Sequence, residues 1–147
     1  MKFGAFPGLS GTTVAGQPLS VVSVFCGAAE PWPSVGNRDL LVSWHLDLDG
    51  GGGDYDWWAN GSGDALATQA AKAAAQVTAR AIYVRPWAEM NADWINFGDV
   101  NRFADAWRRV RNIFKTWAPN VKFVLCPTTD TYVETTDVAL LYPGAGY

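Results

Sequence analysis

Five short apolar segments constrain the fold of this 147-residue chain more than any other feature. Most of them are nearly continuous in apolar or β-branched residues, whereas a strand with one face in water alternates apolar and polar residues. The pattern is typical of strands that are buried on both faces of a parallel sheet. The five predicted strands span residues 2–6, 20–26, 39–45, 81–87 and 121–126.

Two helical patterns lie between the last three predicted strands. Residues 64–78 are rich in alanine, and Ser62 or Asp64 is the expected N-terminal cap. Residues 101–117 carry large apolar side chains at spacings of three and four, which predicts an amphipathic helix that Pro119 stops. The side chains that form this apolar face are Phe103, Trp107, Val110, Phe114 and Trp117.

Strands that alternate with helices indicate an α/β fold with a parallel sheet. The two later strand–helix repeats are each roughly 35 to 40 residues long, close to the repeat of a (β/α)₈ barrel. The two earlier connections, residues 7–19 and 27–38, are shorter and rich in Gly, Pro and Ser. We therefore expect one domain over residues 1–147, a partial or truncated (β/α)₈ TIM barrel. It would have about five parallel strands and two clear helices, and be incomplete at its C-terminal end.

A dense group of polar and aromatic side chains follows the fourth predicted strand. Its apolar run gives way to Arg85, Trp87, Glu89, Asn91 and Trp94. A buried strand has little use for a guanidinium, a carboxylate, an amide and two indoles within ten residues. At the carboxyl end of a barrel strand these groups suit a sugar site. The acid can protonate a glycosidic oxygen, the amide can hold a hydroxyl, and the indoles can cover a pyranose face.

The overall composition excludes several classes of protein. The net charge is −3 and the isoelectric point is about 4.9, so no basic field exists to attract nucleic acid or an anionic membrane. No segment approaches 18 consecutive apolar residues, and the first residues lack the apolar core of a signal peptide. The chain holds eight Trp, and an ordinary core or surface position explains any single one of them better than a ligand site does.

No cofactor and no metal ion is expected from the sequence. Cys26 and Cys126 each follow a strand-like run, and we expect buried free thiols. Residues 47–54 superficially suggest a calcium loop, but Trp58 stands where an EF-hand needs its twelfth-position glutamate. A Gly-rich loop at a substrate rim is the preferred interpretation. His45, the single histidine, follows a strand and either lines a cleft or supports the scaffold.

The residues around Glu89 resemble the acid/base strand of glycoside hydrolase family 26, the β-mannanase family. Residues 85–94 are similar to the family pattern of Arg, two variable residues, His-Glu-Met-Asn-Gly, one residue and Trp. Three further segments resemble, in the same order, the family's Gly-x-Tyr-Asp segment, its Phe-x-x-Ala-Trp-Arg helix and its Tyr-Tyr-Pro-Gly turn. They are residues 53–58, 103–108 and 141–144. The similarity covers about residues 39–147.

The resemblance implies a role for each matching residue. Glu89 would be the general acid/base, and Asn91 an amide that holds a hydroxyl or orients the nucleophile. Trp94 would be the sugar-stacking platform, with Trp87 as a lesser candidate, and Arg85 a positive group near the carboxylates.

Three positions in and near residues 85–94 bear on the resemblance: one adds a further match in residue type, and two differ from the family pattern. Phe97 stands where the family often has a second Trp, and is a further candidate for the sugar platform. The sequence departs from the family at Ala88, which replaces the usual His beside the acid/base, and at Ala92, which replaces Gly.

A retaining glycosidase also needs a second carboxylate about 5 Å from the first, which acts as the nucleophile. In the resembled family it lies on the seventh strand, beyond the five strands predicted here. Asp47, Asp49 and Asp130 follow predicted strands and reach the same rim, but no family motif assigns them this role. A structural alternative for Glu89 is a simple ion pair with Arg85.

The sequence thus predicts a carbohydrate-active domain that binds a polysaccharide or oligosaccharide. In one hypothesis it hydrolyses β-mannan-type polysaccharide by a retaining acid/base mechanism, provided that a nucleophile completes the site. The alternative is a non-catalytic carbohydrate-binding or adhesion module, or a structural subunit of a larger assembly such as a virion tail. An extracellular or virion-associated location is what the resemblance implies. An open sheet edge predicts packing against other protein chains or self-association.

Overall fold

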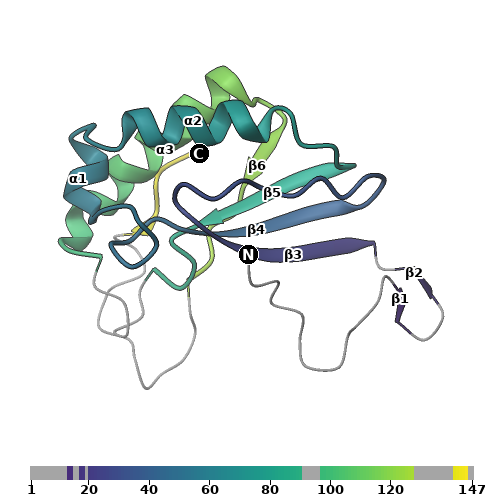
Figure 1. The fold of residues 1–147 in the computed structure, drawn as a ribbon. Coiled ribbons are helices and arrows are strands. Elements are labelled where there is room, and N and C mark those ends of the chain that lie inside the picture. The colour runs from purple at the N-terminus through teal and green to yellow at the C-terminus, as the bar shows by residue number, and fades with distance from the viewer. Residues whose placement is uncertain (1–12, 15–16, 19, 91–96, 128–140, 146–147) are drawn as a thin grey trace.

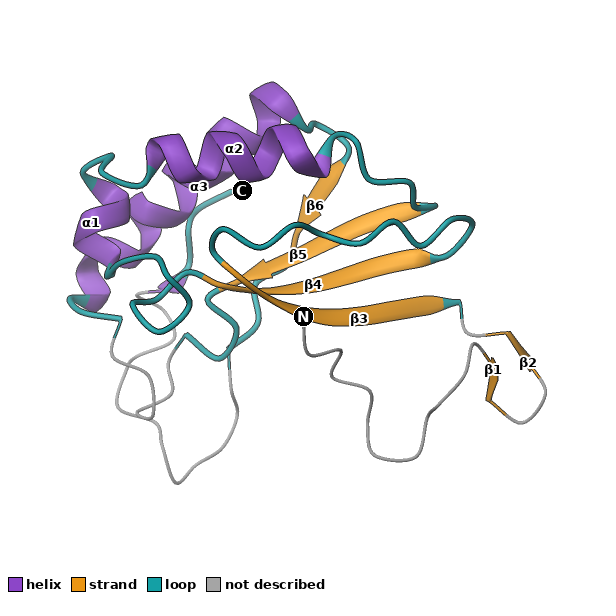
Figure 2. Ribbon diagram, in the orientation of Figure 1, coloured by secondary structure: helices purple, strands orange, loops and turns teal. Residues whose placement is uncertain are grey.

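The computed structural model describes residues 13–14, 17–18, 20–90, 97–127 and 141–145 (Figure 1). This part of the chain is an α/β fold in which helices form a layer on a sheet (Figure 2). The elements are β1 (Thr13–Val14), β2 (Gln17–Pro18), β3 (Val21–Gly27), β4 (Asp39–His45), α1 (Tyr55–Ala59), α2 (Asp64–Ala74), β5 (Ala81–Pro86), the 3₁₀ helix η1 (Val100–Arg102), α3 (Phe103–Trp117) and β6 (Val121–Phe123).

The main sheet has four parallel strands in the order β3-β4-β5-β6, so neighbours in sequence are neighbours in space. β1 and β2 form a separate antiparallel pair. Helices α2 and α3 lie on the same face of the sheet (Figures 1 and 2). Every strand–helix–strand crossover has the same hand, and each new strand is added on the same side of the sheet. Successive helices therefore lie on one face, and the other face carries no helices among the described elements.

The α/β class and the parallel strands are confirmed for the part of the chain that the structure describes. The predicted strands at 20–26, 39–45 and 81–87 appear within one residue of their expected bounds. The predicted strand at 121–126 is shorter, although the Val124 N–H still donates to the Val84 carbonyl at 2.8 Å. The first predicted strand, residues 2–6, lies outside the described residues.

The helices differ from the sequence prediction at their ends. Helix α2 stops at Ala74 instead of continuing to residue 78, and α1 was not predicted at all. The expected cap of α2 by Ser62 or Asp64 is wrong, because the capping position is Gly63 and no side chain bonds there. Ser62 Oγ instead donates to Asn60 Oδ1 at 2.7 Å.

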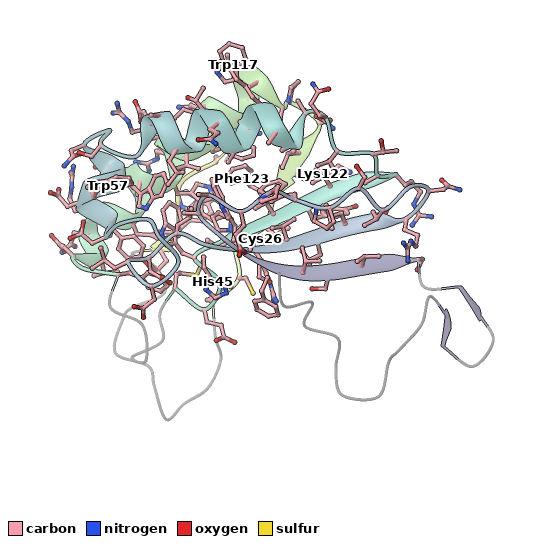
Figure 3. The ribbon with its side chains drawn as sticks, in the orientation of Figure 1. Cys26, His45, Trp57, Trp117, Lys122 and Phe123 are labelled. Carbon is pink, nitrogen blue, oxygen red and sulfur yellow. The ribbon has the colours of Figure 1, made fainter. Side chains whose placement is uncertain are left out.

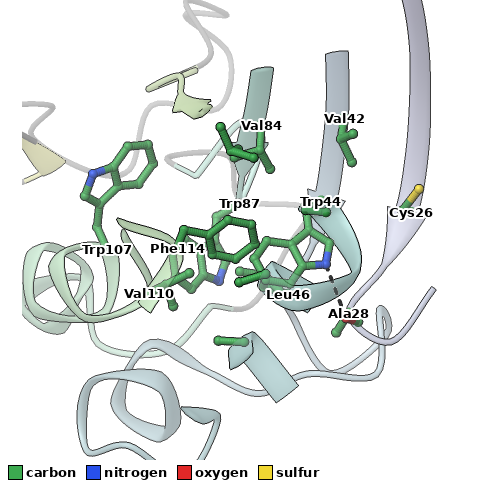
Figure 4. Packing of buried hydrophobic residues seen from close by; sticks show 14 of the residues in the cluster. Cys26, Ala28, Val42, Trp44, Leu46, Val84, Trp87, Trp107, Val110 and Phe114 are labelled. Carbon is green, nitrogen blue, oxygen red and sulfur yellow. Dashed lines mark hydrogen bonds between the residues drawn. The ribbon is translucent and has the colours of Figure 1, made fainter. Parts of the chain in front are cut away.

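An aromatic layer fills the space between sheet and helices (Figure 4). Trp44 from β4 packs edge-on against Trp58 of α1 and Phe114 of α3, with ring centroids 6.3 and 5.4 Å apart. Trp44 Nε1 donates to the Ala28 carbonyl at 3.3 Å, and Trp58 Nε1 donates to the Leu46 carbonyl at 2.8 Å. These indoles therefore join the loops at the strand ends to the core as well as burying apolar surface.

The two faces of the sheet differ, which corrects the expectation of burial on both. Along β5, residues Ile82, Val84 and Pro86 are buried, whereas the residues between them are only half-buried. On β3, Phe25 is 44% exposed and Val21 is 46% exposed. A continuous apolar run does not distinguish a strand covered on both faces from one whose second face is partly open.

The burial of side chains tests two further sequence predictions, which concern the Trp residues of α3 and the cysteines. Trp107 lies in the core as expected, but Trp117, at the last position of α3, is 46% exposed (Figure 3). The Lys72 ammonium lies 4.2 Å from the centre of the Trp117 ring. Both cysteines are free, as predicted; Cys26 is buried, while Cys126 is only partly buried. Of the helices that the structure describes, not one combines the length and the apolarity that crossing a membrane requires.

Candidate functional site

Glu89 lies in the turn that follows β5, at the carboxyl ends of the parallel strands. The turn has two unusual backbone conformations, because Trp87 has φ 49° and Glu89 has φ 61°. Non-glycine residues seldom adopt positive φ, and such conformations gather at functional sites, where surrounding contacts enforce them. One such contact is the Glu89 N–H, which donates to the Cys126 carbonyl at 2.8 Å and joins this turn to the segment after β6.

The Glu89 side chain is exposed, and its carboxylate forms no hydrogen bond or ion pair with a residue that the structure describes. This removes the structural alternative of an ion pair with Arg85. Arg85 Nε instead donates to Ser43 Oγ at 2.7 Å, and Nη1 lies 3.6 Å from Cys126 Sγ. The carboxylate is consequently accessible to a ligand.

Trp87 and Phe97 lie in the core, with 1% and 4% of their surfaces exposed. Trp87 packs edge-on against Tyr55 and Phe103, with ring centroids 5.8 and 5.9 Å apart, and Phe97 stacks on Tyr55 at 5.2 Å. The expectation that Trp87 and Phe97 present sugar-stacking faces is corrected, because protein rings already cover those faces. The Trp87 indole, on a residue with positive φ, thus lies in the core against helices α1 and α3.

Tyr55, the first residue of α1, joins this helix to both flanks of the segment that carries Asn91 and Trp94. Its hydroxyl donates to the Met90 carbonyl at 3.1 Å, and its N–H donates to the Phe97 carbonyl at 2.8 Å. Burial raises the pKa of the Tyr55 phenol well above its usual value, and the nearby Asp47 carboxylate raises it further. The phenol therefore stays a neutral hydrogen-bond donor.

The glycine-rich loop after β4 is a compact structure built on Asp47, which is 6% exposed. Asp47 Oδ1 accepts the Gly50 N–H at 2.6 Å, and the Gly50 carbonyl accepts the Ala28 N–H at 2.7 Å, which ties the loop to the end of β3. A Cβ atom at Gly50 or Gly52 would collide with the backbone carbonyls of His45 and Leu46. Glycine is therefore required for the close approach of the loop backbone to the end of β4.

His45 ends β4 on the side of the sheet away from the helices (Figure 3). Its Nδ1 lies 3.9 Å from Asp47 Oδ2, and its ring centroid lies 5.7 Å from that of Phe25. Asp49 is exposed in the loop beyond. Among the described residues, no group of three or more His, Cys, Asp or Glu side chains is placed to hold a metal ion.

The described structure places Arg85, His45 and Glu89 at or just beyond the carboxyl ends of β4 and β5. Phe25, which sequence reasoning missed, lies next to His45 and Arg85. The weak signal for Phe25 was a large aromatic near the end of an apolar run, where it resembles an ordinary core residue. Asn91, Trp94 and Asp130 lie outside the described residues.

The same edge therefore holds a carboxylate, a guanidinium, an imidazole and an exposed aromatic ring. Such a set can donate protons and hydrogen bonds to a polar ligand while covering an apolar face of it. Compared with known proteins, the chain matches no protein-family model and no curated protein sequence.

Proposed function

We propose that this chain is a carbohydrate-active domain resembling the endo-β-1,4-mannanases of glycoside hydrolase family 26, with Glu89 as its proton donor. The observation that carries the proposal is the position of Glu89. It lies just after the carboxyl end of a parallel strand with φ 61°, its N–H donates to the Cys126 carbonyl, and its side chain is exposed. Catalytic groups of (β/α)₈ enzymes occupy this edge of the sheet.

The strand order supports a segment of a (β/α)₈ barrel. The order β3-β4-β5-β6 never reverses, and helices α2 and α3 share one face. A doubly wound sheet reverses its strand order and carries helices on both faces. In a barrel, the face without helices is the interior, and the substrate binds over the strand ends. Arg85 and His45 lie at this end and offer hydrogen-bond donors to sugar hydroxyls.

The proposed chemistry is acid-assisted cleavage of a glycosidic bond. Glu89 would give its proton to the glycosidic oxygen as the bond to the anomeric carbon breaks, and a second carboxylate would attack that carbon. Water would then hydrolyse the glycosyl intermediate and return the proton to Glu89. Asp47 is a poor candidate for the nucleophile, because it is buried and its carboxylate holds the Gly50 N–H.

The second candidate function is carbohydrate binding without hydrolysis, as in an adhesion module or a structural subunit of a larger assembly. The Asp47 carboxylate accepts a hydrogen bond within its own loop, which makes it unsuited to act as the nucleophile and favours this candidate. Both functions share the ligand class, so binding and turnover must be measured separately.

Turnover is tested by assaying the full chain on β-mannan for new reducing ends, beside a Glu89→Gln variant. The proposal expects the variant to lose 10²-fold or more of the activity, on the order of a general acid's contribution. The matched control is Glu30→Gln, because Glu30 is also exposed at this edge and its hydrogen bond from the Gly27 N–H can be kept by an amide oxygen. Equal activity in both variants would exclude Glu89 as the proton donor.

Binding is tested by calorimetry with manno-oligosaccharides and a Trp94→Ala variant. We expect a marked loss of affinity, because an indole face buries the apolar C–H face of a pyranose. Trp117→Ala is the control, since Trp117 is exposed on the helix side of the molecule. A full-length protein that binds no mannan oligosaccharide, and releases no sugar, would refute both candidate functions.

Association with other protein chains also remains a proposal. Strands β3 and β6 end the sheet within the part of the chain that the structure describes. Unpaired strand edges favour pairing with another chain. Sedimentation velocity over a range of concentrations should show an assembly larger than the monomer of 15.9 kDa.

A further inference from the structure

We propose that Phe25, with His45 and Arg85, forms a saccharide subsite in which the Phe25 ring stacks on the apolar face of a pyranose. This inference deepens the proposed function and rests on it. Phe25 is a core-type residue that is 44% exposed, on the face of the sheet that the helices leave free. The residues next to Phe25 on the sheet indicate what kind of ligand its exposed ring could bind.

The parallel register places these groups next to one another. Phe25 on β3 aligns with Ser43 on β4, which aligns with Arg85 on β5. Ser43 is small and fully buried, and its Oγ accepts a hydrogen bond from Arg85 Nε at 2.7 Å. The bond fixes the guanidinium, whose Cζ lies 5.8 Å from the centre of the Phe25 ring.

His45 is the second polar side chain next to the aromatic ring of Phe25. The two ring centroids are 5.7 Å apart, and the planes are tilted by 33°. The buried Asp47 carboxylate lies 3.9 Å from His45 Nδ1. The other ring nitrogen, Nε2, can exchange a hydrogen bond with a ligand.

The resulting arrangement matches the chemistry of a sugar ring. One face of a β-linked pyranose is apolar, while its hydroxyls project outward around the rim. Phe25 offers the apolar surface, and Arg85 and His45 offer polar groups beside it at nearly equal distances from its centre. A ligand without a rim of hydroxyls would leave the guanidinium donors unused, and so a saccharide is the favoured occupant.

The test measures manno-oligosaccharide binding by calorimetry to the full chain carrying Glu89→Gln, so that no turnover occurs. Adding Phe25→Ala should weaken binding roughly 5- to 10-fold, as expected for one lost ring contact. Phe25→Tyr should keep most of the affinity, whereas Phe25→Leu should not, because it keeps apolar area without a flat ring. Val21→Ala is the control, since Val21 is 46% exposed on the same side of β3.

The outcomes separate this inference from the function on which it rests. Binding that Trp94→Ala weakens and Phe25→Ala leaves unchanged would overturn the subsite alone. Absence of binding in the starting protein would overturn both. If Phe25→Ala instead changes only the sedimentation of the protein, the ring belongs to a contact between protein chains, and the subsite is wrong. Circular dichroism confirms that each variant is folded.

Discussion

The Tyr55 hydroxyl donates a hydrogen bond to the Met90 carbonyl at 3.1 Å and thereby joins the first turn of α1 to the turn that carries Glu89. The two residues are 35 positions apart in sequence, and both are buried. The geometry of the candidate acid therefore depends on a helix that follows a different strand. This contact also gives a structural reason for a tyrosine in the segment that resembles the family's Gly-x-Tyr-Asp.

Replacing Tyr55 by Phe should lower the free energy of unfolding by about 1–3 kcal/mol, because the Met90 carbonyl loses its donor in a buried place. Urea unfolding measures the change. Tyr83→Phe is the control, since the half-buried Tyr83 hydroxyl forms no hydrogen bond with a residue that the structure describes. If the two variants are equally stable, the Tyr55–Met90 bond contributes nothing measurable.

The two tryptophans of α3 should respond differently to truncation. Trp107→Ala should cost about 3–5 kcal/mol, because the side chain is 1% exposed and a cavity would remain. Trp117→Ala should cost less than about 1 kcal/mol, since it removes only a half-exposed ring and its contact with Lys72. Thermal and urea unfolding of both variants test this difference, and a reversed order would contradict the packing of α3.

The two thiols should differ in reactivity towards a disulfide reagent at pH 8. Burial raises the pKa of Cys26 to about 11, with a smaller contribution from Glu30, so only about one thiol in a thousand is ionised. Cys26 is also 1% exposed, whereas Cys126 is partly exposed. One equivalent should therefore react in the folded protein and the second after unfolding. Cys26→Ser and Cys126→Ser identify which thiol reacts first.

The ion pair between Asp64 and Arg109 should make a pH-dependent contribution to stability. The carboxylate accepts two hydrogen bonds, at 2.6 and 2.8 Å, and these hold the pKa of Asp64 below its usual value. The contribution is then fully present above the unfolded pKa, about 4, and is lost as the pH falls through the lower folded value. Both side chains are about 40% exposed, so we expect only about 0.5 kcal/mol.

The measurement is urea unfolding of the wild type and Asp64→Asn between pH 7 and pH 2. The difference in unfolding free energy should be constant down to about pH 4 and should shrink below it. A difference that grows on acidification would mean that the pKa of Asp64 is raised instead of lowered. Asp105→Asn is the comparison variant. It also removes a carboxylate that accepts hydrogen bonds from arginines, Arg102 and Arg108, but these bonds lie on the exposed helix surface.

The amino-acid sequence by itself determined the fold class and the position of most strands of the sheet. Continuous apolar runs at 20–26, 39–45 and 81–87 favoured neighbouring strands of a parallel sheet, although they did not show that one face of it is partly open. The periodicity of residues 101–117 likewise fixed the amphipathic face of α3, although its last member, Trp117, is exposed. Local patterns succeed here because strand and helix periods act over a few neighbouring residues.

Only the tertiary structure decided which aromatic rings are available to a ligand. In sequence, Trp87 looks like a site residue and Phe25 like a core residue, yet the first is buried and the second is exposed. The reason is that exposure depends on the backbone conformation at the strand end and on which face the helices cover. The positive φ of Trp87 and the single-sided helix layer arise from contacts between segments far apart in the chain, and no local period encodes them.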